Sequence, residues 1–144
     1  MKFAIRKLTP GHYDDIIRVW KKAELPFMPR GRDSRRKLTG QMRKDPDLFF
    51  GAFVGKELVG VAFGSYDGRR GTINRLAVVP EYQHKGIAAK LVAKCEKALR
   101  AKGAVVLTTL IEIPNPGSIG LFKKAGYYVH ENVRYLSKRR CRGC

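Results

Sequence analysis

The sequence predicts an α+β fold (an α/β mixed sheet) in which one β-sheet carries helices on both faces. Strand-like and helix-like segments follow one another in the order β-α-α-β-β-β-α-β-α-β. Three strand-like runs joined by tight turns fill residues 48–79, which is typical of an antiparallel meander. A helical segment at residues 84–102 then leads into a further strand, and such a crossover requires two parallel strands.

The N-terminal third of the chain should form one strand and two helices. A short strand is expected at residues 3–8, and Thr9 followed by Pro10 is a typical helix start with Thr9 as the N-cap. The residues that recur at helical spacing in this helix are Tyr13, Ile16, Ile17 and Trp20. A second, basic helix should begin after Asp33 or Ser34, since both are common N-cap residues.

The remainder should form the meander and then alternate helices with strands. The meander strands are expected at residues 48–54, 58–66 and 72–79. The helix at 84–102 has one apolar stripe and should stop at Gly103. A buried strand at 104–111, a short helix capped by Asn115 and a last strand at 127–136 complete the pattern.

Length and composition fit a single domain. The chain has 144 residues, of which 44% are hydrophobic, and it contains neither a signal peptide pattern nor an apolar run of membrane-spanning length. We therefore expect one domain at residues 1–137, a basic and mobile tail at 138–144, a cytoplasmic location and no contact with a membrane. Cys141 and Cys144 form a C-x-x-C pair without a second pair, which favours a frayed, reduced tail and no metal site.

The charge is strongly positive. Lys and Arg number 30 against 12 for Asp and Glu, giving a formal net charge of +18. Such a field attracts polyanions, which include nucleic acid, the ribosome, acidic proteins and phosphorylated cofactors. Many of the cations lie in and before the second helix: Arg30, Arg32, Arg35, Arg36, Lys37, Arg43 and Lys44. A solvated helix face has the same pattern, so the charge alone does not choose a partner.

The segment at residues 76–88 is the clearest candidate for a binding site. A strand ends there, a short loop follows, and a helix begins at a turn that contains Gly86 and Ala88. The first turn of a helix has free N–H groups and a partial positive charge, and small residues let an anion approach them. The pattern suits a pyrophosphate, and it also suits a plain connection between a strand and a helix. The glycine patterns of dinucleotide-binding and Walker A loops are absent.

This segment resembles motif A of the GNAT superfamily of N-acetyltransferases. In that motif Gln or Arg precedes a glycine by three residues, and Gly or Ala follows two residues later; here these are Gln83, Gly86 and Ala88. Residues 115–127 resemble motif B of the same superfamily, and residues 66–71 are similar to a turn of its YpeA-type subgroup. Because the motifs occur in the family's order and the resemblance covers nearly the whole chain, it implies the GNAT acyl-CoA N-acyltransferase fold.

The resemblance also implies acetyl-CoA as cosubstrate and names the residues that would bind it. The backbone of Leu76, Ala77 and Val78 would pair with the pantetheine arm, Asn115 would contact the same arm, and Phe122 would lie near the sulfur. The pyrophosphate and the loop around it would involve Gln83, His84, Lys85, Gly86, Ile87, Ala88 and Ala89.

Two side chains that relatives use in catalysis are missing. Phe122 stands where the family usually has a tyrosine acid, and Leu110 stands where protein N-terminal acetyltransferases often have glutamate. Glu112 would share the face of Leu110 on a regular strand, so it is our candidate general base, although a surface carboxylate would give the same pattern. Tyr127 and Tyr128 are further candidate acids, but tyrosines in a last strand more often belong to the core.

The expected function is N-acetyl transfer from acetyl-CoA to a primary amine, by direct attack in a ternary complex. The amine could be a protein N-terminus, a lysine or a small molecule, and the enzyme a monomer or a homodimer. The alternative is a catalytically weak GNAT-fold module that uses its basic surface to bind RNA, the ribosome or another acidic partner. The missing tyrosine favours this module, whereas the intact loop with Gln83 and Gly86 favours the enzyme.

Overall fold

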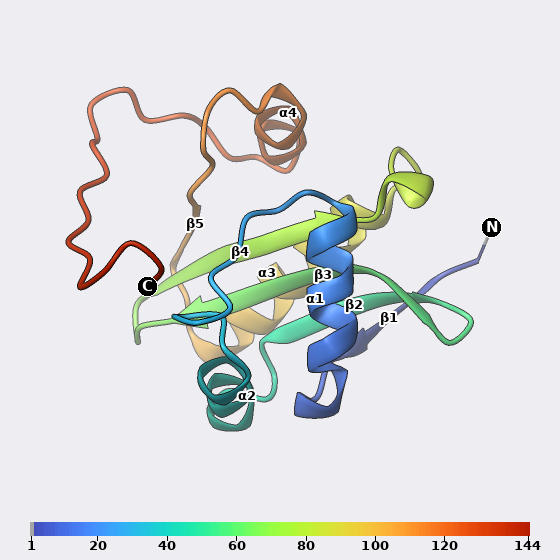
Figure 1. Ribbon diagram of the computed structural model, residues 1–144. Helices are drawn as coiled ribbons and strands as arrows, with labels where there is room; N and C mark the ends of the chain where they lie inside the picture. The colour runs from blue at the N-terminus through green and yellow to red at the C-terminus, as the bar shows by residue number, and fades with distance from the viewer. Residues whose placement is uncertain (1) are drawn as a thin grey trace.

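The computed structural model describes residues 2–144, and within them five strands form one sheet (Figure 1). The strands are β1 (Ala4–Lys7), β2 (Phe49–Val54), β3 (Glu57–Tyr66), β4 (Arg70–Val78) and β5 (Val106–Thr109). They lie side by side in chain order, and all pairs are antiparallel except β4 and β5, which are parallel. The mixed sheet that the element order predicts is therefore present.

Helices cover both faces of this sheet (Figure 1). They are α1 (Tyr13–Lys22), α2 (Arg35–Lys44), α3 (Ile87–Lys102) and α4 (Pro116–Lys124). The helix α1 packs on one face beside α2, and α3 packs on the opposite face against β2, β3 and β4. The core between these layers is apolar, and its largest fully buried side chain is that of Trp20.

The starts of the first two helices follow local capping chemistry. Ser34 caps α2, because its hydroxyl accepts a hydrogen bond from the N–H of Lys37 at 3.3 Å. At Thr9 the predicted α-helix begins instead as a short 3₁₀ turn, Pro10–His12, and α1 starts at Tyr13. The cause is local, since the N–H of Thr9 donates to the His12 ring at 2.9 Å and tightens this turn.

The last predicted strand, residues 127–136, does not form. The segment runs outside the sheet after α4, and several of its apolar side chains are exposed, among them Val133 at 67% and Leu136 at 85% (Figure 1). The alternating pattern was a local signal, but a strand also needs a neighbouring edge with which to pair. The strand β5 that would offer this edge is also shorter than predicted and ends at Thr109.

The C-terminal tail is closed by a disulfide, so the expectation of reduced, frayed cysteines is wrong. Cys141 and Cys144 are bonded, with their Cα atoms 5.3 Å apart. A turn over three peptide units brings the two Cα atoms within the range that a disulfide spans. The carbonyl of Cys144 also accepts a hydrogen bond from the N–H of Arg32 at 2.9 Å, which fixes the tail to the segment before α2.

No helix in residues 2–144 combines the length and the apolarity needed to cross a membrane.

Cys95 should resist thiol reagents in the native protein. It lies outside the disulfide and is fully buried on α3. Burial raises the pKa of its thiol to about 12, and Glu96 adds to the shift. Because the thiolate is the reactive form, Ellman's reagent should label this residue only after unfolding in urea. Prompt labelling of the folded, non-reduced protein, traced to Cys95 by peptide mapping, would contradict the packing of α3.

Candidate active site

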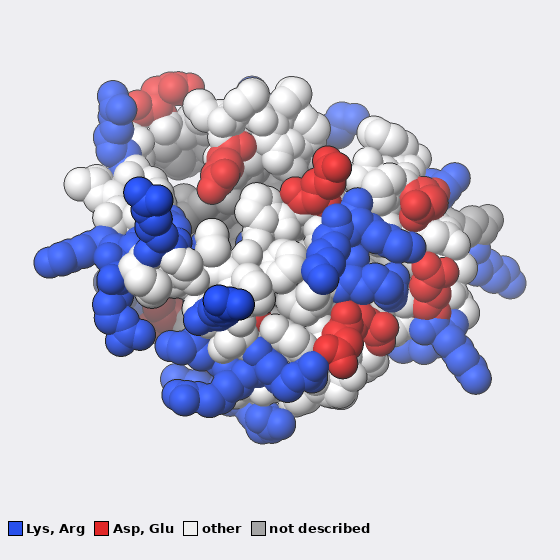
Figure 2. Space-filling view, in the orientation of Figure 1, with Lys and Arg blue, Asp and Glu red and all other residues white. Residues whose placement is uncertain are grey.

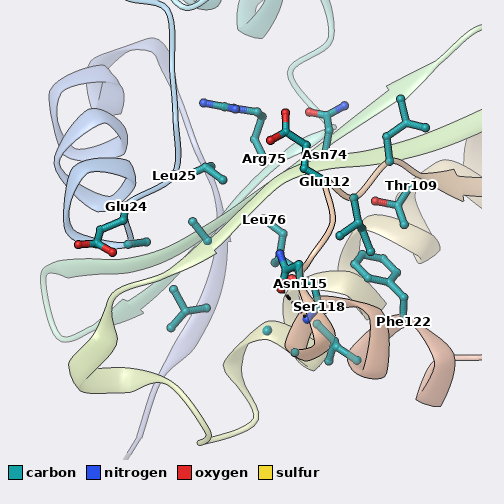
Figure 3. A pocket seen from close by; sticks show the side chains of 18 of the residues that line it. Glu24, Leu25, Asn74, Arg75, Leu76, Thr109, Glu112, Asn115, Ser118 and Phe122 are labelled. Carbon is teal, nitrogen blue, oxygen red and sulfur yellow. Dashed lines mark hydrogen bonds between the residues drawn. The ribbon is translucent and has the colours of Figure 1, made fainter. Parts of the chain in front are cut away.

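The strands β4 and β5 diverge part of the way along their length. Their pairing runs from Arg70 and Val106 to Ile73 and Thr109, where the Thr109 hydroxyl donates to the carbonyl of Ile73 at 2.8 Å. Beyond this point β4 continues to Val78, while the chain after β5 turns away towards α4. The wedge between them is a cleft of about 900 Å³, visible as a hollow in Figure 2 and in close view in Figure 3.

A β-bulge bends β4 at the mouth of this cleft. Val61 of β3 faces Ala77, whereas Phe63 faces Asn74, so β4 has one residue more than β3 in this interval. Arg75 lies in the bulge with a φ of 56°, the left-handed conformation that few non-glycine residues adopt. The bulge therefore turns the strand and redirects the Arg75 side chain.

The Arg75 side chain fastens the loop between α1 and α2 to β4. Its guanidinium lies 4.2 Å from the centre of the Trp20 ring and donates to the carbonyl of Pro26 at 2.8 Å. It also lies 3.7 Å from the carboxylate of Asp33, which in turn accepts from the N–H of Met28 at 2.8 Å. Burial lowers the pKa of the guanidinium, and Asp33 opposes this shift. The sequence analysis missed this residue, although an arginine inside an apolar strand was a detectable signal.

The loop after β4 ends at the amino terminus of α3. His84 and Gly86 both have a positive φ, 60° and 84°, and Gly86 is the N-cap of α3. The first helical hydrogen bond runs from the N–H of Lys90 to the carbonyl of Gly86 at 3.2 Å, so the N–H groups of the first turn are free of helical partners. A Cβ placed on Gly86 would meet no atom within 4 Å, which leaves these N–H groups open to an anion.

The edge of β4 offers backbone groups to the cleft. The N–H of Val79 donates to the carbonyl of Val59 at 2.9 Å, so Val79 faces β3 and the polar groups of Val78 face the opposite way. The carbonyl of Val78 accepts from the Gln83 side chain at 2.9 Å, and this bond ties the loop to the strand. The N–H of Val78 is then the donor directed towards the cleft.

The structure brings nearly all predicted cofactor residues together along this cleft. Those that line it are Leu76, Ala77, Val78, Gln83, His84, Gly86, Ile87, Ala88, Ala89, Asn115 and Phe122. Lys85 belongs to the same loop but is exposed outside the lining, so its side chain does not shape the cleft. Whether these residues bind acetyl-CoA stays a prediction.

The helix α4 closes the far side of the cleft. The Asn115 side chain accepts from the N–H of Ser118 at 3.2 Å and caps α4, which leaves its NH₂ group as the part that can donate to a ligand. Phe122 is buried, with its ring edge-to-face on Tyr127 at 5.0 Å. Phe122 thus supplies an apolar floor and no exchangeable proton.

Neither candidate tyrosine faces the cleft. The Tyr127 hydroxyl donates to the Glu96 carboxylate on α3 at 2.8 Å, and burial together with Glu96 raises the pKa of Tyr127. Tyr128 is 75% exposed and lies beside the His130 ring at 4.7 Å. These positions make both residues poor proton donors for a reaction in the cleft.

Two carboxylates, those of Glu24 and Glu112, belong to residues that line the cleft. Glu112 lies beyond the end of β5, so the strand alternation used to place it does not apply there, yet it still lines the cleft (Figure 3). Glu24, which the sequence analysis did not consider, follows α1 with a φ of 57° and also lines the cleft. Among residues 2–144 there is no group of three or more His, Cys, Asp or Glu able to hold a metal ion.

Comparison with known proteins gives a consistent family. The model of the acetyltransferase (GNAT) family matches residues 14–127. An acetyltransferase of Sodalis glossinidius is 34% identical over 137 residues, and one of Photorhabdus laumondii is 36% identical over 138 residues, each alignment covering 94% of both chains.

Solved structures show the same fold. The PaiA N-acetyltransferase of Thermoplasma acidophilum in complex with coenzyme A has a TM-score of 0.80 at 23% identity, covering 92% of this chain and 94% of that one. An aminoglycoside N-acetyltransferase in complex with CoA has a TM-score of 0.72 at 19% identity, covering 97% and 96%. At these identities the likeness supports the α+β architecture, which confirms the fold class predicted from the sequence.

Proposed function

The chain belongs to the acetyltransferase (GNAT) family, and we propose that it transfers an acetyl group from acetyl-CoA to a primary amine by direct attack in a ternary complex. The observation that carries this proposal is the wedge between β4 and β5, which is lined by the amino terminus of α3 and by two carboxylates, Glu24 and Glu112, whose side of the cleft we take as the acceptor end. One end suits an anionic cofactor, and the other suits a cationic acceptor.

The residues at the α3 end fit a diphosphate. The left-handed N-cap at Gly86 and the free N–H groups of the first turn form a concave set of donors, supported by the dipole of a long helix. From there the open edge of β4 runs along the cleft to Val78, where a pantetheine amide could pair as an added strand would. Acetyl-CoA would supply the activated acyl group and a thiolate leaving group.

The chemistry near Val78 needs an oxyanion donor and a base. The N–H of Val78 is directed into the cleft and would stabilise the negative charge that develops on the carbonyl oxygen. The acceptor amine must lose a proton to become nucleophilic, and Glu112 would take this proton directly or through a water. The departing sulfur would leave as a thiolate and take its proton from solvent, since Phe122 cannot donate one.

The acceptor end favours a positively charged amine. Glu24 and Glu112 both line the cleft. Arginines line it as well, but the guanidinium of Arg75 is engaged by Pro26 and Asp33, and Arg32 and Arg139 belong to the segments before α2 and at the C-terminus. Carboxylates at this place would attract an ammonium group before its deprotonation. A protein N-terminus, a lysine side chain and a small-molecule amine all meet this requirement. A panel of such amines, scored by thiol release from acetyl-CoA, tests the proposal; release with none of them would favour the binding module instead.

Replacing Glu112 with glutamine should lower turnover by about 100-fold, the lower end of the effect of a general base. Affinity for acetyl-CoA, measured by calorimetry, should change little because Glu112 lies at the acceptor end. The matched control is Glu57→Gln at the β2–β3 turn, which removes the same charge from an exposed site. If Glu112→Gln turned over as fast as the wild-type protein at every pH from 7 to 9, Glu112 would have no part in the mechanism.

A further inference from the structure

The C-terminal tail is seated on the segment that precedes α2. The N–H of Arg32 donates to the carbonyl of Cys144 at 2.9 Å, and Gly31 lies against the backbone of Gly143 and Cys144. A Cβ added to Gly31 would lie 2.6 Å from the Cα of Cys144, so the contact depends on the absence of a side chain there. The disulfide closes the tail into a compact turn at this contact.

This docking joins two groups of cations that are far apart in the sequence. We name the joined surface the basic band, and its members are Arg30, Arg32, Arg35, Arg36, Lys37, Arg43, Lys44, Lys138, Arg139, Arg140 and Arg142. Figure 2 shows Lys and Arg gathered along the left and lower margins, where Figure 1 places the tail and α2. Three members have acidic neighbours: Arg35 is paired with Asp14 at 2.6 Å, Arg32 adjoins Asp33, which is buried, and Lys44 precedes Asp45.

The composition of the band suits phosphates better than carboxylates of a protein. Arginine predominates in it, and the planar guanidinium binds phosphate oxygens in pairs. The segment leading into the tail also presents Tyr135, which is 68% exposed and stands between Arg134 and Lys138 in the sequence. An exposed aromatic ring among cations is the arrangement on which bases of a single strand stack.

We propose that the basic band and Tyr135 bind single-stranded nucleic acid. The surface is distinct from the acetyl-transfer chemistry, although Arg32 and Arg139 reach the rim of the cleft, so a bound strand would pass beside the acceptor end. The band would follow the phosphate backbone and Tyr135 would stack with one base, which gives binding with little sequence preference.

The test is fluorescence anisotropy of a labelled uridine 20-mer with the full, non-reduced protein at several salt concentrations. Three triple variants each replace three cations with Gln and so remove equal charge. Two of them change the band: Arg36, Lys37 and Lys44 on α2, and Lys138, Arg140 and Arg142 on the tail. The third is the control, with Lys94, Lys97 and Lys102 replaced on α3. Each band variant should bind at least 10-fold more weakly and flatten the slope of log K against log salt by about 2, the value for three single-strand phosphate contacts. The control should lose less than 3-fold.

A pair of uncharged substitutions separates docking from charge. Gly31→Ala pushes the tail off its seat and should weaken binding by about 3-fold or more, since the two groups of cations are then no longer held together. Gly40→Ala on α2 adds the same methyl group where no atom lies within 4 Å, and it should leave the affinity unchanged. If Gly31→Ala and Gly40→Ala bound the uridine 20-mer with equal affinity, the docked tail would not contribute to binding, and the proposal of one joined basic band would be overturned.

The remaining arms identify the ligand. Tyr135→Ala should bind about 5-fold more weakly than Tyr135→Phe, which keeps a ring for stacking. A deoxythymidine 20-mer that binds equally well would show that the phosphate backbone is what the band recognises, whereas weaker binding would point to RNA. Three results would each overturn the proposal. Poly-glutamate could compete as effectively as the uridine 20-mer, or the α3 control variant could lose as much affinity as the band variants. The third result is an absence of saturable binding at low salt.

Discussion

Replacing Gly86 with valine should weaken acetyl-CoA binding by about 100-fold. Gly86 has a φ of 84°, and a β-branched residue resists this left-handed conformation. The new side chain would also stand beside the free N–H groups of α3 and obstruct a phosphate. The loss of one or two charge-assisted hydrogen bonds to a phosphate amounts to about 3 kcal/mol, which corresponds to the stated loss of affinity. Isothermal titration calorimetry measures it directly.

The control for this variant is Gly68→Val. Gly68 also has a positive φ, 101°, with open space around its added Cβ, but it lies in the turn before β4 rather than at the cleft. It carries comparable backbone strain and should keep the wild-type affinity for acetyl-CoA. If Gly86→Val bound acetyl-CoA as tightly as Gly68→Val does, the diphosphate site would not lie at the amino terminus of α3.

Replacing Trp20 with alanine should lower the free energy of unfolding by about 3 to 5 kcal/mol, the range for a large aromatic residue in a core. Trp20 is fully buried, and its ring contacts Phe27 and Phe63 at centroid distances of 5.9 and 5.7 Å. The Arg75 guanidinium would also lose the ring on which it rests. Urea unfolding followed by far-UV circular dichroism measures the loss, since the protein has a single tryptophan and the variant none.

Trp20→Phe should cost much less than the alanine variant because it keeps a ring at the centre of this aromatic group. The comparison separates the loss of ring contacts from the loss of the indole N–H, which has no hydrogen-bond partner in the structure of residues 2–144. A loss below about 1 kcal/mol for Trp20→Ala would mean that the layer between α1 and the sheet is not packed as described.

Features that depend on neighbouring residues could be predicted from the sequence. Ser34, one of the two candidate caps, caps α2, and Gly103 ends α3 with a φ of 116°, because both signals act within one helical turn. The cleft loop was predictable for the same reason, since the turn at Gly86 and the helix after it are adjacent in the chain. Most predicted cofactor residues accordingly line one cleft.

Features that depend on distant residues could not be predicted in this way. The alternating pattern at 127–136 indicated a strand, but the edge it needed lies on β5, which ends at Thr109. The bulge at Arg75 arises from the pairing of β3 with β4, and the seat of the tail arises from Arg32 meeting Cys144. Glu24 lines the cleft because of the way α1 lies across the sheet, and no local sequence pattern encodes that packing.

The anchoring of the α1–α2 loop through Arg75 sets a condition for engineered chimeras. A graft that exchanges this loop for that of a relative, in order to change the acceptor, would remove Pro26 and Asp33 and leave a partly buried guanidinium with only the Trp20 ring beside it. Such a graft would need to bring its own carbonyl and carboxylate to the bulge, or to replace Arg75 at the same time. Acceptor preference and the shape of the cofactor strand would thus have to be redesigned as one unit.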